Sequence, residues 1–286
     1  MIGTCHRGGV ERSAVESTTK HVTSADGSRI GCEVVGDGPP VVLVHGTAAD
    51  RTQWAPMAGP LGQRFTVYVL DRRGRGLSAE EAAGPYALDR EAEDIAAVVE
   101  SIGGHPFVFA HSYGGLCTLK AAADGVEFER MCIDESPSGR PGPPMVPDQV
   151  VDGLAAALDG GGPDAALEFF LRNVVGLQEE QIAGMRPTPV WQARTATIHT
   201  VVREARSANA YQREGDRLAQ VGYPVRFIVG EQSPPPMRGA MEAAHGDMPG
   251  SEFDVVDGRL FTSMYADPPS VAQQLGDWFL APARAG

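Results

Sequence analysis

The sequence is poor in lysine and in cysteine, and its charge is strongly one-sided. Only two lysines occur, Lys20 and Lys120, and the formal net charge is −13. Proteins that bind nucleic acids or anionic membranes use clusters of basic side chains against the phosphates. The acidic balance therefore predicts no nucleic-acid or membrane partner. We expect a small-molecule or peptide substrate instead, and the oligomeric state stays open.

The cysteines form no pattern that is typical of a metal site. Cys5, Cys32, Cys117 and Cys132 are not paired at the short spacing of zinc ligands, and no histidine joins them at such a spacing. Cys117 and Cys132 lie in apolar stretches, which favours buried thiols over a disulfide. We therefore expect neither a metal nor another cofactor.

Long apolar runs are missing as well. No stretch of about 18 apolar residues occurs, so no membrane-spanning helix is predicted. Residues 1–17 lack the apolar segment of a secretory signal, so we expect a loose tail there and a cytoplasmic protein. The 286 residues, 42% of them hydrophobic, are enough to bury a core without disulfides or metals.

Short apolar runs alternate with helical periodicity along most of the chain. A hairpin is predicted over residues 18–36, and strands over 41–44, 65–70, 107–110, 131–134, 225–229 and 252–256. Helices are predicted over 88–102, 113–123, 238–244 and 270–280, whereas 148–215 shows helical periodicity without clear strands. This pattern predicts an α/β fold, a mostly parallel, doubly wound sheet with a helical cap inserted after the sixth strand. The predicted domains are a core over 1–138 and 216–286 and a cap over 139–215.

The strongest local signal is a strand that runs into a turn of small residues around Ser112. Residues 107–115 read FVFAHSYGG, which fits a strand, a G-x-S-x-G turn with Ala110 as its first member, and a helix. Such a turn exposes the serine hydroxyl and places the amide of Tyr113 at a helix N-terminus, where it can donate to an oxyanion. Ser112 is therefore the candidate nucleophile and Tyr113 a candidate oxyanion donor, while His111 should point away from the serine.

A second signal stands at the end of the first buried strand. Residues 41–47 read VVLVHGT, and in this architecture the turn after such a strand supplies the other oxyanion amide, here that of Thr47. We assign His45 to the substrate pocket, although a histidine at this position is more often structural than a base.

With these motifs, three further segments make the sequence resemble the α/β-hydrolase superfamily along almost its whole length. They are DRRGRGLS at 71–78, VGEQSPP at 229–235, and VDG followed by DP between 256 and 268. The resemblance implies the α/β-hydrolase fold and a structural role for the loop 71–78. It also implies a nucleophile, an acid and a histidine in that order along the chain.

The sequence departs from this superfamily at both partners of the serine. Gln232 stands where the resemblance places the acid, and Phe261 stands where it places the histidine. Phenylalanine accepts no proton, and glutamine carries no charge to orient an imidazolium. Loss of triad members typically lowers the rate by about 10⁴- to 10⁶-fold, so ordinary esterase or peptidase turnover is not expected.

Other residues are candidates for parts of the missing machinery. Asp134 and Glu135 end the strand that follows the nucleophile helix, where the resemblance places the acid in some members. Glu135 would act directly as a base if burial raised its pKa. The resemblance also matches it to a glutamate that accompanies an intact triad, which leaves a structural role equally open. The remaining assignments to the substrate pocket are Gln232, Phe261, Trp191 and His199.

Three functions remain open. We expect first a non-hydrolytic proton transfer alpha to a carbonyl, by an epimerase or isomerase of natural-product biosynthesis that uses the retained oxyanion hole. Glu135 or a substrate carboxylate would be the base. In its damaged triad the sequence is similar to the peptide aspartate epimerase of bottromycin biosynthesis. The alternatives are a slow serine hydrolase that uses Ser112 with a substitute base, and a binding protein without catalysis.

Overall fold

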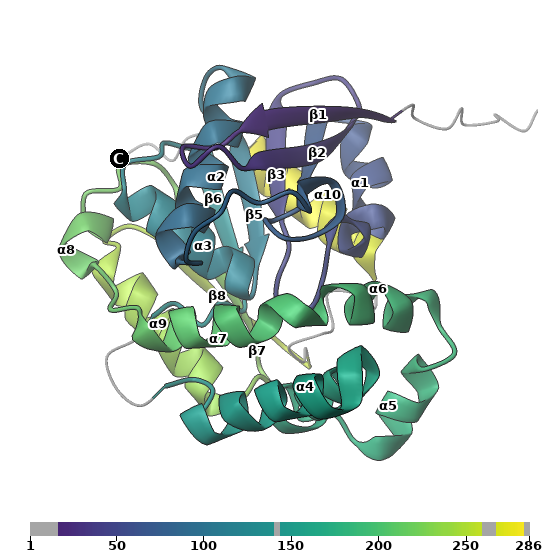
Figure 1. Ribbon diagram of the computed structural model, residues 1–286. Helices are drawn as coiled ribbons and strands as arrows, with labels where there is room; N and C mark the ends of the chain where they lie inside the picture. Colours follow the sequence, from purple (N-terminus) through teal and green to yellow (C-terminus); the bar gives the residue numbers. More distant parts are fainter. Residues whose placement is uncertain (1–16, 140–143, 259–266, 283–286) are drawn as a thin grey trace, which may run out of the picture.

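The computed structural model describes residues 17–139, 144–258 and 267–282. In these residues an eight-stranded sheet runs in the order β1-β2-β4-β3-β5-β6-β7-β8 (Figure 1). The strands are β1 (Ser17–Thr23), β2 (Arg29–Val35), β3 (Pro40–Val44), β4 (Thr66–Leu70), β5 (Phe107–His111), β6 (Arg130–Asp134), β7 (Val225–Gly230) and β8 (Glu252–Val256). β2 pairs antiparallel with β1 and β4, and the other pairings are parallel. The predicted α/β fold with a mostly parallel sheet is confirmed.

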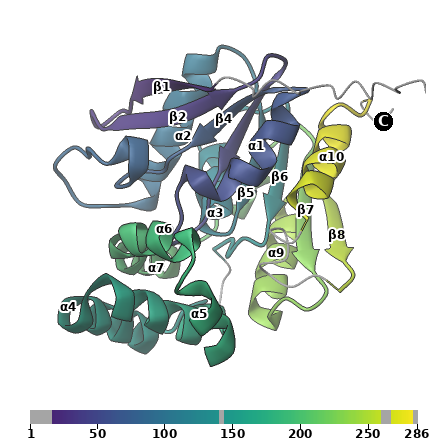
Figure 2. The same ribbon diagram turned by 90° about the vertical axis from the view of Figure 1, so that its right-hand side faces the viewer.

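Helices cover both faces of this sheet (Figure 2). One face carries α1 (Ala55–Gly62) and α10 (Pro268–Phe279); the other carries α2 (Leu88–Ile102), α3 (Tyr113–Ala123), α8 (Gly215–Leu218) and α9 (Pro235–Asp247). The packing of the central strand β3 explains why its sequence is apolar throughout. Val41 and Leu43 pack toward α1 and α10, whereas Val42 and Val44 pack toward α2 and α3. Successive side chains of a strand point to opposite faces, so a strand covered on both faces has no polar position.

A group of helices between β6 and β7 stands where the cap is predicted, and we call it the helical insert. It comprises α4 (Asp148–Phe170), α5 (Glu179–Met185), α6 (Pro189–Thr197) and α7 (Val201–Ala210). These helices share an apolar cluster of their own, which also contains Ala48 from the turn after β3. The insert therefore packs against the end of the sheet at which β3 finishes, and Figures 1 and 2 show it along that end.

One helical segment is absent from the sequence-based prediction. The 3₁₀ helix Arg51–Trp54 runs directly into α1, a stretch for which no helix is predicted. Prolines and glycines in α1 lower its helical propensity and obscure its periodicity. Burial of Trp54, Met57 and Leu61 against the sheet outweighs that weak local preference.

Other expectations concern buried thiols, membranes and metals. Cys117 and Cys132 are buried, as predicted. Among the residues that the structure describes, no helix has the length and apolar character to cross a membrane. The same residues contain no group of three or more histidine, cysteine or acidic side chains placed to hold a metal ion. The predicted tail falls almost entirely outside the described residues.

Candidate functional site

Ser112 occupies the junction between β5 and α3 in a strained backbone conformation. Its φ of 53° and ψ of −128° lie in a region that residues with a side chain rarely adopt. The amide of Ser112 donates to the Asp134 carbonyl at 2.9 Å, and its own carbonyl accepts from the Gly115 amide at 2.8 Å. Such strain costs about 1–3 kcal/mol and persists only where the surrounding structure holds the residue in place. The predicted sharp turn is present, and the serine keeps part of its surface exposed.

Glycines make room for this turn. A Cβ at Gly46 would lie 2.9 Å from the Cβ of Ser112, and a Cβ at Gly114 would lie 2.4 Å from the carbonyl oxygen of His45. The turn after β3 and the start of α3 therefore pack directly against each other. Thr47 follows Gly46, so this contact brings Thr47 close to the nucleophile turn. Tyr113, the other candidate oxyanion donor, directly follows Ser112 in that turn.

This packing predicts an unusual result for a glycine in a helix. Gly114→Ala should destabilise the protein by about 2 kcal/mol, because the clash with backbone exceeds the gain of about 1 kcal/mol in helix propensity. Gly59→Ala in α1 is the matched control, since a Cβ there meets nothing within 4 Å. The control should leave stability unchanged or raise it. Urea unfolding measures both, and equal stability of the two variants would contradict the packing described here.

A buried histidine and aspartate meet beside the serine. His111 Nδ1 lies 2.8 Å from Asp134 Oδ2. The two residues are register partners at the ends of the parallel strands β5 and β6. An imidazole held by a carboxylate at Nδ1 is the arrangement that orients the base in a catalytic triad. The sequence analysis considers Asp134 as a possible acid but does not predict its pairing with His111, which the parallel register of β5 and β6 brings about.

Glu135 is buried next to this pair, also with a positive φ of 53°. Its Oε1 accepts from the Gly230 amide at 2.7 Å and from the Ser233 hydroxyl, which ties β6 to the loop after β7. Its Oε2 is buried without a hydrogen-bond partner among the described residues. Burial raises the pKa of this carboxyl, and the bonds from Ser233 and Gly230 oppose the rise only in part. The Asp134 carbonyl accepts from the Ser112 amide, and Glu135 is the next residue of the chain. Glu135 therefore follows directly on the contact between β6 and the nucleophile turn.

His45 is a structural residue. It is fully buried, its Nδ1 lies 2.8 Å from the Gly46 carbonyl oxygen, and its Nε2 lies 3.1 Å from the Arg72 amide. An amide can only donate, so Nε2 accepts and Nδ1 carries the proton of a neutral ring. Burial, followed by the nearby charges of Arg75 and Arg72, holds the pKa of His45 well below 6.5. The assignment of His45 to the pocket wall is therefore corrected to support of the turn.

The other predicted pocket residues lie in different surroundings. Trp191 is buried in the apolar cluster of the insert and donates through Nε1 to Asp164 at 2.6 Å. His199 is exposed, with Nε2 at 3.1 Å from the Gly74 carbonyl oxygen. Gln232 is exposed in the loop between β7 and α9. Phe261 lies outside the described residues.

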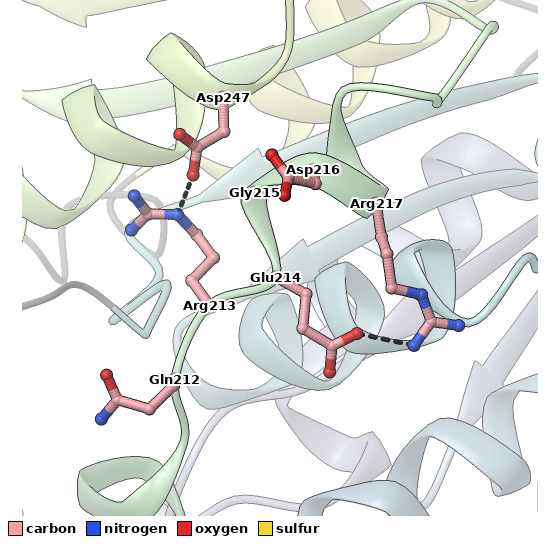
Figure 3. Close-up of a pocket in the computed structure, with 7 residues that line it drawn as sticks. All are labelled: Gln212, Arg213, Glu214, Gly215, Asp216, Arg217 and Asp247. Atoms are coloured by element: carbon pink, nitrogen blue, oxygen red, sulfur yellow. Dashed lines mark hydrogen bonds and ion pairs between the residues drawn. The ribbon is translucent and has the colours of Figure 1, made fainter.

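A separate pocket lies away from the nucleophile turn (Figure 3). It has a volume of about 480 Å³ and is lined by residues 212–217 together with Asp247. Its charged groups pair with one another, Arg213 with Asp247 and Glu214 with Arg217. None of the predicted site residues lines it, so we assign it no part in the site.

Comparison with known proteins places the chain in a family. Residues 41–261 match the alpha/beta hydrolase family. The chain belongs to the alpha/beta hydrolase family. The turn at Ser112 and the turn after β3 both fall inside the matched segment, as does the helical insert.

Similar proteins carry the names of hydrolases. The chain is 33% identical over 139 residues to N-formylmaleamate deformylase of Pseudomonas putida, a match that spans 47% of this chain and about half, 52%, of that relative. It is 30% identical over 230 residues to the pimeloyl-[acyl-carrier protein] methyl ester esterase of Stenotrophomonas maltophilia, covering 77% of this chain and 85% of that one. An alpha/beta hydrolase structure from Sphaerobacter thermophilus is similar with a TM-score of 0.77 and 32% identity, over 91% of this chain and 100% of that chain.

Proposed function

We propose that this protein is a serine hydrolase that cleaves a small ester or amide through its Ser112 hydroxyl. The observation that carries the proposal is the strained turn, in which a serine and not a glycine adopts a positive φ at the start of α3. Strain of this kind is concentrated at functional sites. The names of the deformylase and the methyl ester esterase describe cleavage of acyl bonds. They support hydrolysis, and they offer no support for the epimerase or isomerase that the sequence analysis expects first.

The proposed reaction has two halves. The Ser112 hydroxyl attacks the substrate carbonyl while its proton passes to a base, and the negative charge on the carbonyl oxygen is stabilised by the amides of Thr47 and Tyr113. The bond to the leaving alcohol or amine breaks as the leaving group takes up the proton. Water then attacks the acyl-serine ester, which releases the acid and restores the hydroxyl.

Glu135 is the base that we propose for this reaction. The resemblance assigns Gln232 and Phe261 to the usual acid and histidine positions, so the proposal needs another acceptor for the proton of the hydroxyl. Glu135 has a buried oxygen without a hydrogen-bond partner among the described residues, next to the residue that binds the Ser112 amide. A carboxylate whose pKa is raised is a better base than an ordinary one. His111, oriented by Asp134, is the competing candidate.

The pH dependence of kcat/KM distinguishes these two bases. The active form of Glu135 is the carboxylate, and its raised pKa predicts that kcat/KM rises with pH through a value above 4.5. Glu135→Gln should lower kcat/KM by about 10²-fold or more and remove this acid limb. His111→Gln is the matched variant and should keep the limb. Loss of the limb in His111→Gln, with the limb retained in Glu135→Gln, would assign the base to His111.

The hydrolase itself is tested by covalent labelling and by a substrate panel. A fluorophosphonate should form one adduct, which mass spectrometry of peptides locates on Ser112, and short p-nitrophenyl esters and formamides should be hydrolysed slowly. Ser112→Ala should show neither the adduct nor the hydrolysis. A wild-type protein without adduct and without turnover would overturn the proposal. Incorporation of deuterium from D₂O into an unhydrolysed carbonyl compound would then point to proton transfer.

A further inference from the structure

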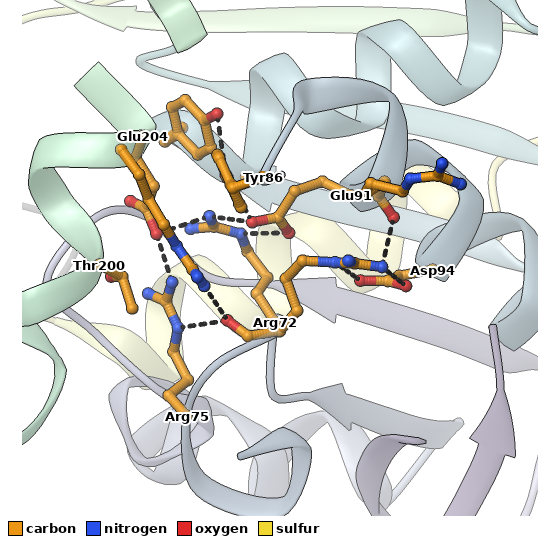
Figure 4. A network of polar contacts seen from close by, with 12 residues as sticks. Arg72, Arg75, Tyr86, Glu91, Asp94, Thr200 and Glu204 are labelled. Atoms are coloured by element: carbon orange, nitrogen blue, oxygen red, sulfur yellow. Dashed lines mark hydrogen bonds and ion pairs between the residues drawn. The ribbon is translucent and has the colours of Figure 1, made fainter. Parts of the chain in front are cut away.

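The loop between β4 and α2 buries arginines against the helical insert. Arg72 and Arg75 both contact the carboxylate of Glu204 in α7, and Arg72 Nη2 lies 2.9 Å from its Oε1 (Figure 4). Arg72 also binds Glu91 of α2, through Nη2 at 2.7 Å and Nε at 3.1 Å. None of these four side chains is more than 1% exposed. Two positive and two negative charges balance, as buried charges require.

Arg72 reaches from this cluster to the turn after β3. Its Nη1 donates to the Gly46 carbonyl oxygen at 3.1 Å, and His45 Nδ1 donates to the same oxygen at 2.8 Å. The peptide that joins Gly46 to Thr47 is planar, so its carbonyl and its N–H point in opposite directions. Two donors that hold the Gly46 oxygen therefore set the direction of the Thr47 N–H.

The same guanidinium also contacts the second oxyanion residue. Arg72 lies over the ring of Tyr113, with 4.7 Å between the guanidinium carbon and the ring centre. The Tyr113 hydroxyl is 3.0 Å from that of Tyr86, which donates to Glu91 at 2.8 Å. The Arg72 side chain thus contacts both the peptide group that carries the Thr47 amide and the ring of Tyr113, and it is held in part by the insert.

We propose that Glu204 is a positioning residue, which holds Arg72 so that the Thr47 amide points at the carbonyl oxygen of the substrate. This inference rests on the proposed hydrolysis at Ser112. Oxyanion stabilisation would then depend on the position of α7, because Glu204 of this helix binds Arg72. A residue that acts in this way should change kcat more than KM, since the oxyanion forms after the substrate has bound.

The test uses a variant that removes the ion pair between Arg72 and the insert and keeps the buried charges balanced. Glu204→Gln combined with Arg75→Met leaves Arg72 paired with Glu91 alone. We expect kcat for a p-nitrophenyl ester to fall by about 10- to 100-fold, with KM within about twofold, because one misdirected oxyanion donor costs up to about 10²–10³ in kcat. Arg75 also donates to the Ala49 carbonyl oxygen at 3.3 Å, so Arg75→Met alone is the reference for exchange. Relative to that variant, amide hydrogen exchange of the peptide that covers residues 44–50 should accelerate about tenfold or more in the double variant.

The control is Glu168→Gln in the same insert. Glu168 pairs with Arg172 and Arg186 at the surface, so this variant should change neither kcat nor the exchange of residues 44–50. Equal exchange in the double variant and in Arg75→Met alone would overturn the inference, whatever the activity. A rise in KM with constant kcat, or faster exchange with constant kcat, would overturn it as well. If the wild-type protein hydrolyses nothing, the proposed function fails, and the exchange measurement still decides whether Glu204 holds the turn.

Discussion

Replacing Ser112 by glycine is expected to abolish hydrolysis and to stabilise the protein. The loss of the nucleophile should lower kcat/KM by about 10³-fold or more. The backbone of residue 112 has a φ of 53°, which glycine adopts without strain. Relief of about 1–3 kcal/mol exceeds the cost of about 0.5–1 kcal/mol for the greater chain entropy of glycine. The net gain of about 1 kcal/mol corresponds to a rise in Tm of about 2–4 °C for a protein of this size.

Ser112→Ala is the matched variant for this result. It loses the hydroxyl but keeps a Cβ, so activity should fall equally while Tm stays close to that of the wild type. Calorimetry and kcat/KM for a p-nitrophenyl ester measure the two effects separately. Residual hydrolysis by Ser112→Ala near the wild-type rate would place the nucleophile elsewhere. A glycine variant with a lower Tm than the alanine variant would show that the turn stores no strain.

Glu204→Gln alone is expected to cause a large loss of stability. It leaves the buried guanidinium groups of Arg72 and Arg75 with a single carboxylate, that of Glu91. Removing one partner of a buried ion pair costs about 3–5 kcal/mol, whereas replacing both partners by uncharged groups is often neutral. The double variant with Arg75→Met should therefore recover most of the loss. Glu168→Gln, at a surface pair, should cost less than about 1 kcal/mol.

The same group predicts how stability depends on pH. Burial alone would raise the pKa of Glu204, but Arg72 and Arg75 outweigh it and lower the pKa from 4.5 to about 2. A carboxyl with a lowered folded-state pKa stabilises the protein above its unfolded-state pKa, and this contribution is lost as the pH falls toward the folded-state value. The wild type should lose about 3 kcal/mol from this group between pH 4.5 and pH 2. Urea unfolding at several pH values should show that the free energy of unfolding of Glu204→Gln lacks this part of the decline. If the free energies of the wild type and the variant fell in parallel with pH, the ion pair would be contradicted.

Most of the fold follows from local patterns. Apolar runs such as 41–44 and 107–110 predict buried parallel strands because a strand covered on both faces has no polar position. The turn at Ser112 is equally local, since the strand, the small residues and the helix start lie within nine positions of one another, in residues 107–115. The helix over Ala55–Gly62 is the exception, because its apolar residues are stabilised by the sheet and not by their own propensity.

The partners of the polar groups at the site required the tertiary structure. His111 meets Asp134 only because β5 and β6 are in parallel register. Arg72 meets Glu204 across 132 positions of the chain, and no spacing rule selects that carboxylate from the other acidic residues. A charged side chain takes its partner from the chain segments that packing brings together. The sequence by itself therefore determined the sheet and the nucleophile turn. Packing decided which charged groups hold the neighbouring turn after β3, and that His199 binds the loop at Gly74 instead.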